Sequence, residues 1–310
     1  MEEPRSYIRL GRFVLLLFIL VFISSLIFKG PFAGLLNWST FNFVFRSSNL
    51  SNIVRNNLEG SNGDWAVYIE ELKSEEKYSL REQEEFPAAS LYKLYLMAAV
   101  LKEINDERLK IDDTVTSTKS RLISVYGSVD SGYDSAPETI SYTVDEALTR
   151  IGRVSDNFAS IMLIDKIGLD KIQGMAEELG AKNTKIKSPT LIVIEGEDPY
   201  ISTTAFDIGL FFKKLYRKEI GNAAVSEKLA EYLRLNQLSD RIPKSLPEGV
   251  KVIHKTGELS RVRHDGGVVY LPENQYVIVL MSQNLKDENE GIETMKNISK
   301  EVYEYFLSKK

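Results

Sequence analysis

The spacing of apolar and polar residues predicts β-strands near both ends of the chain and helices between them. The apolar run from Trp65 to Ile69 predicts a strand, and a charged turn at 70–77 leads from it into a short second strand. Late in the sequence, runs rich in Val, Ile and Tyr predict strands at 250–255, 267–271 and 276–282. We therefore expect an α+β fold in which the two ends form one antiparallel sheet and the helical middle forms a lobe beside it.

Helical periodicity and helix-starting residues mark several of the expected helices. Pro87 precedes a strongly apolar segment, and Thr143 with Glu146 three residues later has the spacing of a capping box. The last expected helix carries its apolar residues along a single stripe. The predicted helices include 88–104, one starting at 142–148, 203–216 and 290–307.

An uncharged apolar run, Phe13–Phe28, follows Arg5, Arg9 and Arg12 near the N-terminus. Its sixteen residues lie between the length of a signal-peptide core and the roughly 20 residues of a membrane span. We expect residues 1–29 to be a cytoplasmic tip and an uncleaved signal anchor, so that the rest of the chain lies outside the cytoplasmic membrane. A cleaved signal peptide, which would give a secreted protein, is the alternative.

Residues 30–62 contain many Asn, Ser and Phe and indicate a linker or stalk before a folded domain at 63–310. The 43% hydrophobic and 27% charged composition is ordinary for a folded protein. The net charge of −5 gives no reason to expect nucleic-acid binding. The absence of cysteine and the presence of only two histidines leave few ligands for a metal, and we expect no metal and no organic cofactor.

The first chemical motif is Ser90-Leu-Tyr-Lys93 at the start of the apolar helix 88–104. Residues i and i+3 share a helix face, so the Lys93 amine is expected beside the Ser90 hydroxyl. Burial would lower the pKa of Lys93 and make it a base for a serine nucleophile. The spacing alone is weak evidence for a catalytic pair, because Ser74 and Lys77 have the same spacing in a charged turn.

The second motif, Ser155-Asp156-Asn157, opens another predicted helix. The Ser155 hydroxyl could pass a proton to a leaving amine, and the Asn157 amide could orient the lysine or hold a substrate carbonyl. Ordinary helix capping by Ser155 or Asp156 is the simpler interpretation of this motif taken alone.

The third motif, Lys255-Thr256-Gly257, is expected at the end of a strand. The Lys255 amine and the Thr256 hydroxyl could bind a substrate carboxylate, and Gly257 would let a substrate backbone approach closely. The backbone N–H of Glu258 could pair with that of Ser90 to stabilise an oxyanion.

Taken together and in this order, the three motifs resemble the signature of class A β-lactamases and penicillin-binding proteins. The resemblance covers roughly residues 64–310 and implies an antiparallel sheet flanked by helices plus an all-helical lobe. It also implies that Ser90 is acylated by a β-lactam or by a peptidoglycan stem peptide ending in D-Ala-D-Ala. The surrounding segments that also resemble the family are Phe86–Lys93, Tyr142–Asn157, Thr203–Leu210 and His264–Pro272.

One position departs from the class A pattern. That class carries a glutamate that activates the deacylating water, and a count from Gly180 places Thr190 there instead. With a shifted loop, Glu195, Glu197 or Asp198 could serve as this base, but an exposed acidic turn is the interpretation that we favour for them. We therefore expect slow deacylation, which is the behaviour of a penicillin-binding protein.

The strand after the third motif carries His264 where some family members place arginine. Arg261 or Arg263 could supply that charge instead.

Two rival functions remain. A Ser-His-Asp hydrolase would have to use His254 or His264, and the chain has no G-x-S-x-G elbow. A non-catalytic sensor or cell-wall-binding module could use the same fold. The complete set of motif residues argues against a decayed site, but a sensor could keep acylation and lose deacylation.

Overall fold

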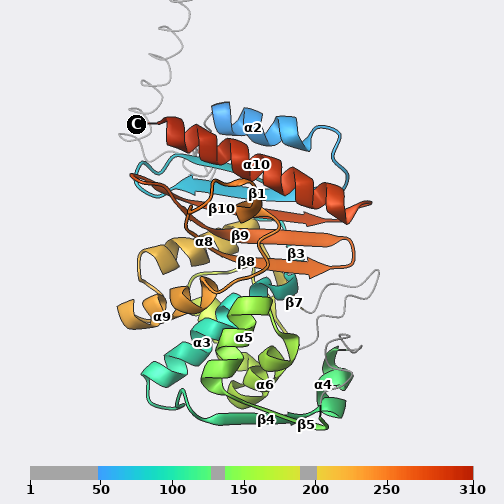
Figure 1. Cartoon of the computed structure of the whole chain (residues 1–310), viewed down its shortest axis with the longest axis vertical. Helices are drawn as coiled ribbons and strands as arrows, with labels where there is room; N and C mark the ends of the chain where they lie inside the picture. The colour runs from blue at the N-terminus through green and yellow to red at the C-terminus, as the bar shows by residue number, and fades with distance from the viewer. Residues whose placement is uncertain (1–47, 127–136, 189–200, 310) are drawn as a thin grey trace, which may run out of the picture. The chain divides into compact units, whose positions relative to one another are not determined.

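The computed structural model describes residues 48–126, 137–188 and 201–309, and a five-stranded antiparallel sheet lies at the centre of this part of the chain (Figure 1). Strand β1 pairs with the last strand, β10, with Trp65 opposite Ser282, so the two ends of the domain meet in one sheet as predicted. The strands run in the order β2 (Lys77–Leu80), β1 (Asp64–Glu71), β10 (Gln275–Gln283), β9 (Val262–Tyr270) and β8 (Val252–Leu259).

Both faces of this sheet are covered by helices. Helices α2 (Ser48–Leu58) and α10 (Glu288–Ser308) lie on one face, and α8 (Ala205–Tyr216) lies on the other (Figure 1). Alternate residues of β1 therefore enter different apolar clusters: Val67 packs on the α10 side and Tyr68 on the α8 side. Since every strand residue finds apolar surroundings, β1 and β10 have nearly continuous hydrophobic sequences.

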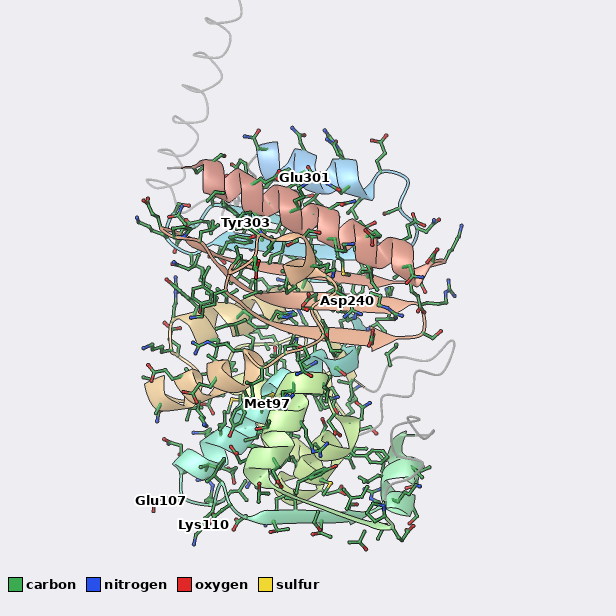
Figure 2. The ribbon with its side chains drawn as sticks, in the orientation of Figure 1. Met97, Glu107, Lys110, Asp240, Glu301 and Tyr303 are labelled. Atoms are coloured by element: carbon green, nitrogen blue, oxygen red, sulfur yellow. The ribbon has the colours of Figure 1, made fainter. Side chains whose placement is uncertain are left out.

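Helix α2 corrects the predicted stalk. Residues 48–58, which the sequence assigned to a linker, form a helix whose Leu50 and Val54 are fully buried against the α10 side of the sheet. Asn57 of α2 donates a hydrogen bond at 2.9 Å to Glu301 of α10, the residue labelled on that helix in Figure 2. The folded domain therefore includes this helix and does not begin at residue 63.

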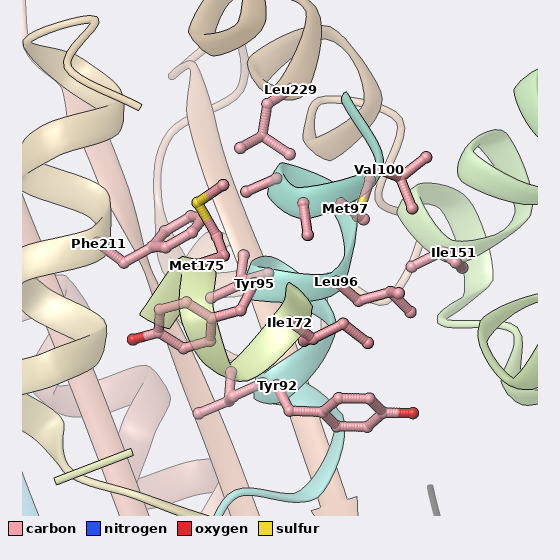
Figure 3. Packing of buried hydrophobic residues seen from close by; sticks show 14 of the residues in the cluster. Tyr92, Tyr95, Leu96, Met97, Val100, Ile151, Ile172, Met175, Phe211 and Leu229 are labelled. Atoms are coloured by element: carbon pink, nitrogen blue, oxygen red, sulfur yellow. The ribbon is translucent and has the colours of Figure 1, made fainter. Parts of the chain in front are cut away.

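Helix α3 (Lys93–Asn105) forms the centre of the helical lobe. Leu96, Met97 and Val100 of α3 lie among side chains from the surrounding helices, such as Ile151 and Leu229 (Figure 3). This burial explains why α3 is apolar on nearly all sides. The other helices of the lobe and its flank are α4 (Lys119–Tyr126), α5 (Val144–Val154), α6 (Asn157–Ile167), α7 (Leu169–Glu178) and α9 (Ala223–Leu233).

Two small sheets complete the fold. Strands β4 (Thr114–Thr118) and β5 (Thr139–Thr143) pair at the far end of the helical lobe (Figure 1). Strand β7 (Ile201–Thr203) lies between β3 (Phe86–Pro87) and β6 (Lys185–Ile186). This second sheet holds the chain just before Ser90, because β3 leads directly into the first chemical motif.

The structure leaves two sequence predictions untested. No helix within the three described ranges is long and apolar enough to cross a membrane. The run Phe13–Phe28, on which the predicted anchor rests, lies outside the described residues. Thr190 and the acidic residues after it also lie outside them.

The burial of α2 generates a stability prediction. Leu50→Ala should lower the free energy of unfolding of the full-length protein by about 2 to 5 kcal/mol, because it leaves a cavity beneath α2. Asn52→Ala, an exposed change on the same helix, should alter it by less than about 0.5 kcal/mol. Urea unfolding measures both values. Equal stability of the two variants would show that α2 is not part of the cooperative domain.

Candidate active site

The segment that carries Ser90 is a tight, strained turn. After β3 the chain forms a 3-10 turn, η3 (Ala89–Tyr92), and α3 begins only at Lys93. The prediction of one continuous α-helix that carries both Ser90 and Lys93 is therefore wrong. Ala89 has a φ of +46°, a left-handed conformation that residues with a Cβ rarely adopt. Ala89 and Leu91 are buried whereas Ser90 is half-buried. Such local strain is often found where a reactive side chain must be presented.

Gly257 brings strand β8 against this turn. A Cβ at Gly257 would lie 3.2 Å from the Cβ of Ala89 and 3.3 Å from the carbonyl oxygen of Ala88. The neighbours that require glycine here thus belong to the turn that carries Ser90. The third motif, Lys255-Thr256-Gly257, lies inside β8, which continues to Leu259. The prediction that it lies at the end of a strand is therefore wrong.

Lys93 is fully buried and bonds to the second motif. Its Nζ donates to the carbonyl oxygen of Ser155 at 2.5 Å and to Oδ1 of Asn157 at 2.6 Å, and it lies 3.3 Å from Oγ of Ser155. Burial, and then the nearby charge of Lys255, lower the pKa of Lys93 well below its usual value, although Asp156 opposes this. A neutral amine has two N–H bonds, and the two carbonyl oxygens satisfy both. Its lone pair then remains available to accept a hydroxyl proton.

A sharp reversal of the chain turns the second motif toward Lys93. Helix α5 ends at Val154, and Ser155 follows with a φ of +56° as its left-handed cap. Asp156 then caps α6, accepting a hydrogen bond from the Ala159 N–H at 2.9 Å. Asp156 therefore has the capping role that the sequence suggested. This cap also positions its two neighbours, Ser155 and Asn157.

Lys255 reaches the same serine from β8. Its Nζ donates to Oγ of Ser155 at 2.8 Å and to the carbonyl oxygen of Thr256 at 2.7 Å. Lys255 is 1% exposed, and burial lowers its pKa to about 7, against the opposing charge of Asp265. The structure therefore joins Lys93, Ser155, Asn157 and Lys255 in one hydrogen-bonded cluster.

Arg241 is a component of the site that the sequence did not reveal. It is 1% exposed, and its Nη2 donates to Oε2 of Glu258 at 2.7 Å. Its positive charge is one of the factors that lower the pKa of Lys255. Arg241 lies in a polar segment before β8, where nothing in the local pattern signals a buried side chain.

The arginines suggested from the sequence lie elsewhere. Arg263 donates to the carbonyl oxygens of Leu259 and Val262 and contacts Glu288, which ties the β8–β9 turn to α10. Arg261 donates to the carbonyl oxygen of Leu285. Neither makes a bond to the cluster around Ser155 within the described residues, and the buried cation next to that cluster is Arg241.

The two histidines support the surrounding structure. His254 donates from Nδ1 to Oδ1 of Asp265 at 2.9 Å, and both side chains are buried. His264 donates from Nε2 to the carbonyl oxygen of Pro87 at 2.8 Å, which fixes the start of the turn that carries Ser90. Burial lowers the pKa of His264 to about 4, so its imidazole is neutral at pH 7 and does not replace an arginine.

The lowered pKa of Lys255 predicts how stability depends on pH. In the unfolded chain Lys255 holds its proton up to about pH 10.5, whereas in the folded protein Lys255 loses this proton near pH 7. The unfolded state therefore binds more protons in this window, so Lys255 makes the free energy of unfolding rise with pH, by at most about 1.4 kcal/mol per unit.

Lys255→Met removes this titration while keeping much of the stem volume. Urea unfolding at pH 7.5 and 9.5 should show that the wild-type protein gains stability relative to the variant at the higher pH. A difference between the two proteins that stays constant with pH would contradict the lowered pKa.

Known proteins resemble this chain in sequence. A profile of the Beta-lactamase enzyme family matches residues 48–306. Beta-lactamase BRO-1 of Moraxella catarrhalis is 28% identical over 243 residues, which is 73% of this chain and 75% of that protein. D-alanyl-D-alanine carboxypeptidase DacF of Bacillus subtilis is 28% identical over 163 residues, which is 50% of this chain but only 39% of that protein.

Solved structures share the fold. A leucine-to-glutamate mutant of PBP-A, in an acyl-enzyme complex with penicillin G, superimposes with a TM-score of 0.72 at 22% identity, over 84% of this chain and 96% of that one. The TLA-3 extended-spectrum beta-lactamase gives 0.74 at 22% identity, over 83% and 98%. These similarities confirm the predicted fold of an antiparallel sheet flanked by helices with a helical lobe. The chain belongs to the β-lactamase enzyme family of serine hydrolases.

Proposed function

We propose that this protein forms an acyl-enzyme at Ser90 with β-lactams or with peptidoglycan peptides that end in D-Ala-D-Ala. The observation that carries the proposal is the buried cluster in which Lys93 and Lys255 share the hydroxyl of Ser155, next to the turn that presents Ser90. The names of two relatives, a beta-lactamase and a D-alanyl-D-alanine carboxypeptidase, favour these two substrate classes.

In this mechanism Ser90 Oγ attacks the amide or lactam carbonyl while Lys93 takes its proton. Lys93 is suited to this because burial favours its neutral form, and Asn157 orients its amine. The Ser155 hydroxyl lies between the two lysines and passes a proton to the leaving nitrogen.

The substrate carboxylate binds Lys255 and Thr256, and Arg241 adds positive charge beside them. The backbone N–H groups of Ser90 and Glu258 form the oxyanion hole. The contact of Gly257 with Ala89 supports this assignment, because it brings β8 alongside the turn that carries Ser90.

Deacylation is slow in this proposal. The sequence offers Thr190 where class A enzymes have the glutamate that activates water. An enzyme that acylates readily but releases the acyl group slowly behaves as a penicillin-binding protein. The same departure supports the second candidate function, a penicillin-binding sensor that is acylated and does not turn over.

We also propose that the domain acts on the outer face of the cytoplasmic membrane, held there by the apolar run Phe13–Phe28. Peptidoglycan peptides are found on that side of the membrane.

Substitution of the proposed nucleophile and base tests the mechanism. Ser90→Ala should abolish covalent labelling of the full-length protein by a fluorescent penicillin, and Lys93→Ala should slow it by about 10²- to 10⁴-fold. Ser74→Ala is the matched control, because Ser74 and Lys77 repeat the motif spacing in an exposed turn, and it should label normally. Labelling of Ser90→Ala at the wild-type rate would refute the assignment.

A further inference from the structure

Glu258 directly follows the third motif on β8, and its carboxylate lies between two arginines. Its Oε2 accepts a hydrogen bond from Nη2 of Arg241 at 2.7 Å and lies 3.8 Å from Nε of Arg263. The Glu258 side chain is 53% exposed, whereas that of Arg241 is 2% exposed. The acid is therefore the member of the pair that can move into solvent, and the buried arginine is the member that stays in place.

This contact satisfies the guanidinium of Arg241 only in part. Its Nε is buried and has no hydrogen-bond partner among the residues that the structure describes. Its Nη1 lies 3.7 Å from Oδ1 of Asp240, the residue labelled in Figure 2, which is beyond hydrogen-bond distance. Nε and Nη2 form one edge of the guanidinium, and such an edge matches the two oxygens of a carboxylate. A carboxylate on this edge would satisfy the unpaired donor, which Glu258 does not do.

The pair of Arg241 and Glu258 acts on the lysine that binds the substrate carboxylate in the proposed function. The charge of Arg241 lowers the pKa of Lys255, whereas the charges of Asp265 and Glu258 raise it. Glu258 therefore offsets the positive potential that Arg241 brings to this end of the site. A substrate carboxylate that arrives here meets a guanidinium that already has a counter-charge.

The structure leaves room for Glu258 to move away from Arg241. Both residues line a cavity of about 310 Å³, and Lys244 lines it as well. Lys244 is exposed and forms no ion pair within residues 48–126, 137–188 and 201–309. A displaced Glu258 carboxylate would thus find both solvent and a cation in the same cavity.

We infer that Glu258 is a specificity-determining residue that competes with the substrate carboxylate for Arg241. In the free enzyme the Glu258 carboxylate occupies Nη2, and a substrate acid must displace it to reach the edge formed by Nε and Nη2. The inference rests on the proposed function, which places the substrate carboxylate at Lys255 and Thr256. Substrates with a free carboxylate are therefore acylated more slowly than the buried arginine alone would allow. Uncharged esters and amides do not meet this competition.

A supporting role for Glu258 would have the opposite effect. If Glu258 held Arg241 in the orientation that a substrate carboxylate needs, removal of its charge would slow acylation by acids. Damage to β8 or to the oxyanion hole would slow acylation as well. Only competition predicts that loss of the Glu258 charge makes acylation faster, and only for substrates with a carboxylate.

Glu258→Gln removes the charge and keeps both the size of the side chain and the backbone N–H. Acylation of the full-length protein is followed by intact mass with penicillin G, which carries a carboxylate, and with its uncharged methyl ester. We expect Glu258→Gln to speed acylation by penicillin G about fivefold to tenfold and to leave acylation by the ester within about twofold of wild type. Glu258→Ala, which also removes the hydrogen bond to Arg241, should speed acylation by penicillin G at least as much.

Glu293→Gln is the matched control. Glu293 is an acid of similar exposure, 61%, and it pairs with Lys296 within α10. This variant removes the same charge from the protein without touching Arg241, so it should change neither rate.

The outcomes separate this inference from the function beneath it. If Glu258→Gln slows acylation by penicillin G or leaves its rate unchanged, the inference is wrong and the proposed function stands. Equal acceleration with penicillin G and with the ester would also overturn it, because the effect would not depend on the substrate carboxylate. If neither compound acylates Ser90 in any of these proteins, the proposed function fails and the inference fails with it.

Discussion

The candidate active site depends on two buried lysine amines that meet at one serine hydroxyl. Lys93 comes from the helical lobe and Lys255 from the sheet, and both bond to Ser155, so the contact also joins the two halves of the domain. Two ammonium groups at this depth would repel each other and lose their hydration, which makes a doubly charged pair costly. Burial therefore lowers the pKa of both amines, and the neighbouring charge of Lys255 lowers that of Lys93 further. In the proposed mechanism, this lowered pKa is what makes Lys93 the base for Ser90.

Several features of the fold serve this contact. The turn that carries Ser90 is held from three directions: by pairing of β3 with β7, by the bond from His264 to Pro87, and by the close approach of Gly257 to Ala89. The reversal between α5 and α6 presents Ser155 and Asn157 to the same space. Since these supports come from distant parts of the sequence, the site exists only in the complete fold, and no single motif would create it.

Much of the fold and the site could be predicted from particular residues. The capping box of Thr143 and Glu146 is present as predicted, and the late Val- and Ile-rich runs form the expected strands. The helix at 48–58 was missed because its sequence, SNLSNIVRNNL, is rich in residues typical of loops, and its four apolar contacts with the core, from Leu50, Ile53, Val54 and Leu58, are interspersed with polar residues. Burial of Arg241 depends on its tertiary contact with Glu258, to which local sequence patterns give no guide.

The protonation state of Lys93 tests the account most directly. The full-length protein, labelled with ¹³C at lysine Cε, can be titrated by NMR, with Lys93 assigned by comparison with a Lys93→Arg variant. The account predicts that this one resonance titrates at a pH well below the usual 10.5, because burial lowers the pKa of Lys93. A Lys93 signal that titrates near 10.5, together with those of the exposed lysines, would contradict the assignment of Lys93 as the base.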